Sequence, residues 1–86
     1  MDRNQVRVLK EPFAMQYGRS LRAAGFNLSL SLGGSSDDAS LEVRLQPLDG
    51  KEPTQIKADS AARSLPKIYR GAPVNVQYAG QVTPQT

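Results

Sequence analysis

An all-β fold, a small β-sandwich or barrel of six to seven short strands, is predicted for this chain of 86 residues. Two observations predict it. Apolar and polar residues alternate over residues 26–32 and 41–46, which is the period of a strand with one buried face. Clusters of Gly, Ser, Asp and Pro separate the apolar runs at short intervals, which is typical of domains built from short strands.

The elements follow from the same pattern read along the chain. Two helical turns are expected: one over residues 19–24, ended by Gly25, and one over residues 61–64, ended by Pro66. The turn residues 33–40 are expected to join an antiparallel hairpin. The expected strands are residues 6–8, 13–17, 26–32, 41–46, 54–58, 67–70 and 74–78.

The predicted organisation is a single β domain over residues 13–80 between two extended arms. Residues 1–12 form the N-terminal arm with its first short strand, and residues 81–86 form the C-terminal arm. The alternation also predicts which strand residues are buried, because a slip by one residue would move every leucine to the wet face. The predicted core is Phe26, Leu28, Leu30, Leu32, Leu41, Val43, Leu45, Val74, Val76 and Tyr78.

Charge and composition limit the possible functions. The net charge is +3, and an acidic segment at residues 26–59 lies between basic segments at residues 1–25 and 60–86, an asymmetry that can steer a partner or another copy of the chain. The start is polar, and no stretch approaches the ~20 apolar residues of a membrane span, so we expect neither a signal peptide nor membrane insertion.

Catalytic and metal sites are not expected. The chain has no Cys and no His, so zinc and redox metals lose their usual ligands, and Ser or Thr lacks the usual base. The adjacent carboxylates Asp37 and Asp38 do not have the spacing of a calcium loop, and Gly33-Gly34 is not part of a phosphate loop. We therefore expect no enzyme activity, no cofactor and no metal ion.

A small β-barrel that binds nucleic acid is the alternative from another functional class. Such barrels stack bases on aromatic side chains beside basic residues, and Tyr69-Arg70 is the one place where a ring and a cation adjoin in the sequence. Phe26 and Tyr78 fall in phase with the core, however, and the acidic middle segment would repel phosphate. Nucleic-acid binding is therefore the weaker expectation.

A structural role in a protein assembly is favoured instead. The Ser-interleaved strands, the absence of Cys and the Pro-bearing ends resemble small β-rich virion proteins of tailed bacteriophages, especially capsid decoration or cement proteins. The resemblance implies a virion protein, in the host cytoplasm during assembly, that binds the major capsid protein and copies of itself; a tail or head–tail connector component fits as well. The expected partner-binding residues are Arg3, Val6, Arg7, Val8, Leu9, Lys10, Tyr69, Arg70, Val82 and Pro84.

Overall fold

The chain folds into three helices and a sheet of four strands in a computed structural model that describes residues 1–50 and 52–83. The all-β prediction is wrong, because helices account for about as many residues as strands do. The helices are α1 (Arg3–Arg7), α2 (Lys10–Ala23) and α3 (Gln55–Arg63). The strands are β1 (Phe26–Gly34), β2 (Ala39–Pro47), β3 (Ile68–Tyr69) and β4 (Ala72–Tyr78).

Strands β1 and β2 form the predicted antiparallel hairpin. Each strand has nine residues, and they pair one to one from Phe26 opposite Pro47 to Gly34 opposite Ala39. The register places Leu28, Leu30 and Leu32 on one face of β1, with the intervening serines on the other. Alternation over this many residues is a strong strand signal, and here it was sufficient.

The rest of the sheet is built by a crossover. Strand β4 pairs with β2 in parallel, and α3 lies between the two in the sequence, so the strand order is β1-β2-β4-β3. Strand β3 pairs antiparallel with the first two residues of β4. The two edges of the sheet are therefore β1 on one side and, on the other, the short β3 followed by the unpaired remainder of β4.

The N-terminal quarter is helical, where an extended arm and short strands were predicted. Asp2 begins α1 with a capping box: its carboxylate accepts the Gln5 backbone N–H at 2.8 Å, and its own N–H donates to the Gln5 side chain at 2.9 Å. Pro12 lies in the first turn of α2, where its missing N–H needs no acceptor. Buried residues recur at helical spacing, namely Val6, Leu9, Phe13 and Leu21.

Helix α3 replaces the strand predicted over residues 54–58 and the later single turn. Its N-cap is Thr54, whose hydroxyl accepts the Lys57 backbone N–H at 3.1 Å. Ala58 and Ala61 face the core, so this helix buries small side chains and carries little apolar signal in the sequence. The other predicted turn, residues 19–24, is the end of α2, and Gly25 follows it with the positive φ of 95° that favours glycine.

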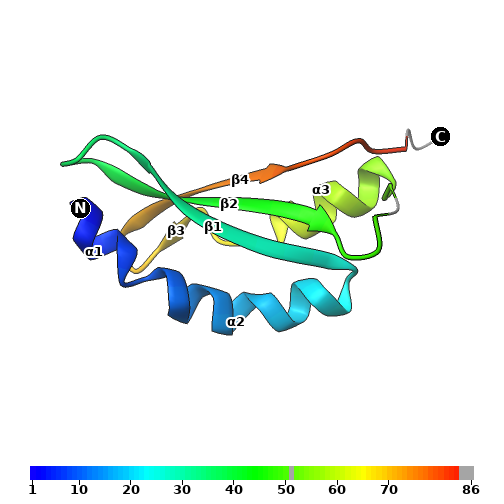
Figure 1. Ribbon diagram of the computed structural model, residues 1–86, viewed down its shortest axis with the longest axis horizontal. Coiled ribbons are helices and arrows are strands. Elements are labelled where there is room, and N and C mark those ends of the chain that lie inside the picture. Colours follow the sequence, from blue (N-terminus) through cyan, green and yellow to red (C-terminus); the bar gives the residue numbers. More distant parts are fainter. Residues whose placement is uncertain (51, 84–86) are drawn as a thin grey trace.

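The helices pack on one face of the sheet, and the other face is open. Figure 1 shows α2 running beneath β1, with α1 under the tip of the β1–β2 hairpin and α3 toward the other end of the molecule. The predicted core residues do turn to the helix face: Leu41, Val43, Leu45, Phe26 and Val74 are buried, and the others pack partly buried against them. The open face carries Asn27, Ser29, Ser31, Arg44, Asn75 and Gln77.

Candidate functional site

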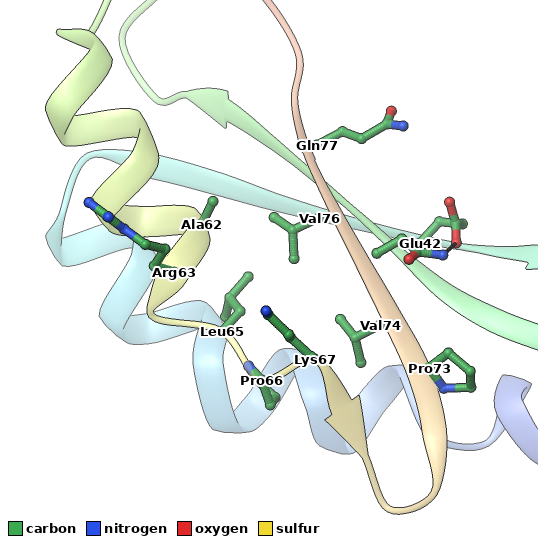
Figure 2. A pocket seen from close by; sticks show the side chains of 11 residues that line it. Glu42, Ala62, Arg63, Leu65, Pro66, Lys67, Pro73, Val74, Val76 and Gln77 are labelled. Carbon is green, nitrogen blue, oxygen red and sulfur yellow. Dashed lines mark hydrogen bonds between the residues drawn. The ribbon is translucent and has the colours of Figure 1, made fainter.

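A groove of about 780 Å³ runs along the unpaired edge of β4 and is the leading candidate site. It exists because β3 pairs only with Ala72 and Pro73, which leaves the rest of β4 without a neighbouring strand. Helix α3 and the segment after it form the opposite wall, so the groove is bounded by a strand edge on one side and by residues 62–67 on the other (Figure 2).

The floor of the groove is apolar. Val74 and Val76 point from β4 toward Leu65, which follows the end of α3 (Figure 2). Val74 and Leu65 are each 7% exposed and belong to the main core, whereas Val76 is only partly covered. Pro66 and Pro73 line the lower end of the groove and make it rigid there. A ligand in the groove would contact an existing part of the core.

Two basic residues lie on the wall opposite β4, with different orientations. Lys67 extends over the floor between Leu65 and Val74, whereas Arg63 points away from β4 (Figure 2). Both side chains are exposed, and no hydrogen bond or ion pair is recorded for either among the described residues. Lys67 is therefore a cation that lies beside an apolar floor, and its ammonium group is free to pair with an incoming carboxylate.

The rim on the open face of the sheet is anchored by Glu42. One carboxylate oxygen accepts hydrogen bonds from the Ser40 hydroxyl and the Asn75 amide, both at 2.7 Å. Gly33 makes this possible, because a Cβ at position 33 would lie 2.6 Å from Cγ of Glu42. A glycine on the neighbouring strand thus allows the Glu42 side chain to reach Asn75 and hold this rim in place.

The edge of β4 offers backbone groups as well as side chains. The Ala79 N–H donates to the Leu45 carbonyl of β2 at 2.8 Å, whereas the Val74 N–H donates to the Lys67 carbonyl on the other side of β4 at 2.9 Å. Because the backbone groups of successive strand residues alternate in direction, those of odd-numbered residues in β4 point toward β2 and those of even-numbered residues point away from it. The N–H and C=O of Val76 and Tyr78 therefore point away from β2. No backbone partner for them is recorded in the part of the chain that is described.

Three of the predicted partner-binding residues are part of the core. Val6 is 0% exposed, Leu9 is 8% exposed and Tyr69 is 6% exposed. Val6 and Leu9 face the sheet from the N-terminal helices, and Tyr69 packs edge-on against Phe13 with ring centroids 5.1 Å apart. These side chains stabilise the fold and are not available to a partner, so residues 1–12 are not the extended binding arm that was predicted.

The remaining predicted residues stay at the surface. Arg3, Arg7 and Val8 are exposed, and Val8 is 70% exposed. Arg70 lies over the ring of Tyr69, 5.2 Å from its centroid, at the turn between β3 and β4. That turn approaches the N-terminus, since a Cβ on Gly71 would lie 3.6 Å from Sδ of Met1. Lys10 and Val82 are half-buried, and Pro84 lies outside the described residues.

The aromatic side chains lie together in the core, which bears on nucleic-acid binding. Phe13, Tyr17 and Tyr69 form one cluster, and Phe26 packs edge-on against Tyr78 with ring centroids 6.0 Å apart. These are all the aromatic residues of the chain, and they pack between the helices and the sheet. The open face therefore has no ring on which a base could stack.

Among the described residues, Tyr78 has the one ionisable group with a clear pKa shift. Its hydroxyl is buried without a hydrogen-bond partner among the described residues. Burial raises the pKa of Tyr78 above its usual 10.0, and the Glu52 carboxylate adds to the rise.

The described residues contain no cluster of three metal-ligating side chains, and none of their helices is long and apolar enough to span a membrane.

Comparisons with protein-family models, with curated proteins and with solved structures find no match. The groove must therefore be interpreted from its own geometry. Nothing in the sequence indicates that Leu65, Lys67 and Val76 form a site, because only the short β3 and the crossover through α3 bring them together. The adjacent Pro66 and Lys67 gave no sequence signal of a groove.

Proposed function

We propose that this protein is a docking module, without catalytic activity, that binds an extended segment of another protein along the free edge of β4. The observation that carries the proposal is the pair of outward-facing backbone positions, Val76 and Tyr78, beside the groove. An extended peptide can add a strand to such an edge, and main-chain hydrogen bonds then supply affinity with little demand on sequence.

The walls of the groove indicate which segments would bind best. Alternate side chains of an added strand point to opposite faces of the sheet. Those on the helix side would meet the apolar floor at Leu65 and Val76. A carboxylate placed near Lys67 would meet a cation that has no ion pair among the described residues. We infer that the preferred segment alternates apolar and polar residues and carries an acidic residue.

The chemistry of the groove supports binding rather than catalysis. Among the described residues that line the groove, Glu42 is the one carboxylate, and that group is already hydrogen-bonded to Ser40 and Asn75. The described lining of the groove holds no Ser or Thr with an adjacent base, and the sequence has no His to act as a base and no Cys to act as a nucleophile. Its side chains can position a peptide but offer no general acid–base pair.

A labelled synthetic peptide tests the proposal directly. The probe is a fluorescein-labelled peptide of alternating Val and Thr with one central Asp. Binding is measured by fluorescence anisotropy, and the site is mapped by amide chemical shifts. We expect saturable binding with the largest shifts at Val76 and Tyr78.

Two control peptides make this test specific. A peptide N-methylated on the residues that would face β4 should not bind, because it lacks the backbone donors. A peptide with Lys in place of Asp should bind more weakly, because it would meet Lys67 with a like charge. Equal binding of all three peptides, or shifts that avoid β4, would contradict the proposal.

The capsid assignment stays a prediction of the sequence resemblance. A capsid shell is one assembly whose subunits could offer an extended segment to β4. The test is to fractionate a lysate of the native source by sedimentation and to locate the chain by antibody. The prediction requires the chain to travel with megadalton particles, and it is wrong if the chain stays with small proteins.

A further inference from the structure

The free edge of β1 carries none of the features that normally keep sheet edges from pairing. Natural edge strands are short, bulged, charged or interrupted by Pro. Strand β1 has nine residues, pairs with β2 without a bulge, and contains no charged residue and no Pro. Its leucines at 28, 30 and 32 are only partly covered by the helices. This long, neutral edge is available for another strand.

The hydrogen-bond pattern shows which groups of β1 are available. Leu48 donates to the Gly25 carbonyl at 3.0 Å, so Gly25 and the odd-numbered residues that follow point their backbone groups toward β2. The N–H and C=O of Leu28, Leu30 and Leu32 therefore point outward. No partner for these groups is recorded among the described residues.

We propose that β1 pairs with β1 of a second copy of this chain, antiparallel and with Leu30 on the two-fold axis. The segment Leu28-Ser29-Leu30-Ser31-Leu32 reads the same in both directions. In this register Leu30 faces its own copy, Leu28 faces Leu32 of the second copy, and all of these residues have outward backbone groups. A two-fold interface must be complementary to itself, and this segment meets that condition.

The side chains fit the same register on both faces. On the open face, Ser29 of one copy lies opposite Ser31 of the other. Within each copy Ser29 pairs with Arg44 and Ser31 with Glu42, so the row across the joined sheet runs from Arg44 of one copy to Glu42 of the other. Each row therefore has a positive end in one copy and a negative end in the other. At the ends of the strand, the bulky Phe26 would face Gly34 of the second copy. No like charges meet anywhere along the paired strands.

The helix layer is compatible with this pairing. Ala14 and Gly18 of α2 lie about 100° around the helix from Phe13 and Tyr17, which contact Tyr69 near the opposite edge of the sheet. A Cβ on Gly18 would meet nothing within 4 Å, and the adjacent Met15 is 75% exposed. These small residues leave room on a surface of α2 that also carries the exposed Arg19 and Arg22.

The exposed area of the single chain also favours a second copy. The chain exposes 5584 Å², whereas about 5,000 Å² is typical of a folded monomer of this mass. The molecule is elongated, with extents of 42 × 22 × 18 Å. Joining the two β1 strands would make one continuous sheet and cover the half-exposed leucines, while leaving the β4 groove free for another protein.

Cross-linking tests both the pairing and its register, because the chain contains no Cys of its own. Two single variants are made, S29C and S31C, each conservative and at an exposed position. They are oxidised separately and as an equal mixture, and the products are separated on non-reducing gels.

In the proposed register, residue 29 of one copy faces residue 31 of the other in a non-hydrogen-bonded pair, where side chains come closest. We expect a linked dimer mainly in the mixture. The matched control is Q77C, which lies on the same face but away from β1.

The outcomes decide the proposal either way. A mixed S29C–S31C dimer that forms at least tenfold faster than the S29C or S31C dimers alone supports the Leu30-centred register. Equal rates in all three samples, or rates no faster than that of Q77C, overturn it. Sedimentation of the unmodified chain gives the second readout. The proposal requires a concentration-dependent dimer, and a monomer at every concentration overturns it even if some cross-linking occurs.

Discussion

The two edges of this sheet expose the same backbone groups but differ in the side chains around them. The edge at β1 is long, neutral and lined by leucines that repeat symmetrically about Leu30. The edge at β4 is short, lies in a groove against α3, and has Lys67 over an apolar floor. Unpaired backbone groups make both edges available for strand pairing. In our proposals the side chains select the partner, which is a second copy at β1 and a different protein at β4.

The largest effect on stability is expected from a substitution in the aromatic core, which lies beneath both edges of the sheet. Phe13 is 0% exposed and contacts the rings of Tyr17 and Tyr69, linking α2 to the far side of the sheet. Phe13→Ala should lower the free energy of unfolding by about 3–5 kcal/mol, which is a large part of the stability of a small domain. Urea unfolding followed by circular dichroism measures this. A loss below about 1 kcal/mol would show that the aromatic cluster does not hold α2 in place.

A charge-pair experiment separates the two edges next. In the Leu30-centred register, Ser29→Lys with Ser31→Lys places like charges opposite each other twice, whereas Ser29→Lys with Ser31→Glu places opposite charges there. At up to ~1 kcal/mol a pair, the first variant should weaken dimerisation about tenfold or more relative to the second. Sedimentation equilibrium measures the difference. Equal dimer affinities would exclude this register, and neither variant should change peptide binding at β4.

The corresponding experiment at β4 uses two cations of the same wall. Lys67→Glu should weaken binding of the Asp-containing peptide several-fold, because the cation over the groove becomes an anion. Arg63→Glu changes the net charge equally, but this side chain points away from β4 and should have less effect. Raising the salt concentration should reduce the difference, since exposed charges are screened. Equal losses in both variants would mean that charge acts at long range and not in the groove. Dimerisation through β1 should be unchanged.

The smallest effect concerns Tyr78, which lies at the end of β4 and packs on Phe26 of β1. Tyr78→Phe removes a buried hydroxyl that has no hydrogen-bond partner among the described residues, so it should raise stability by about 1 kcal/mol. The effect should also depend on pH. The raised pKa of Tyr78 means that the folded state keeps its proton longer than the unfolded chain does.

The raised pKa of Tyr78 contributes to the free energy of unfolding. This contribution is fully present below pH 10.0 and is lost as the pH rises through the higher pKa of the folded state. Wild type should therefore lose more stability than the Phe variant in alkaline solution. Thermal melts of both proteins at neutral and at alkaline pH provide the comparison. A difference that does not change with pH would show that this hydroxyl titrates normally.

The sequence predicted the parts of the fold that local patterns determine. Alternation located β1, β2 and most of β4 and identified their buried face, because side chains alternate strictly along a strand. The same reasoning failed for the N-terminus, where Val6-Arg7-Val8 imitates a strand over three residues. The helical spacing of Val6, Leu9 and Phe13, and the capping box at Asp2, were the stronger signals.

Neither candidate interface could be located from the sequence alone. The symmetry of residues 28–32 is visible there, but its importance depends on β1 being an edge, which follows from the strand order. The β4 groove depends on the crossover through α3 and on the shortness of β3, and both are long-range features. Of the residues predicted to bind a partner, Val6 and Leu9 were selected because they are apolar, and Tyr69 because its ring adjoins Arg70. Burial in the core explains an apolar or aromatic side chain at these positions equally well.

Hydrogen exchange at the amides of β1 tests the central claim most directly. The amides of Ser29 and Ser31 face β2 and should be protected at every protein concentration. Those of Leu28, Leu30 and Leu32 face outward and should become protected only as the concentration rises and β1 pairs with its copy. Nuclear magnetic resonance resolves each amide separately. Fast exchange of the three leucine amides at all concentrations would contradict the pairing of β1 with itself.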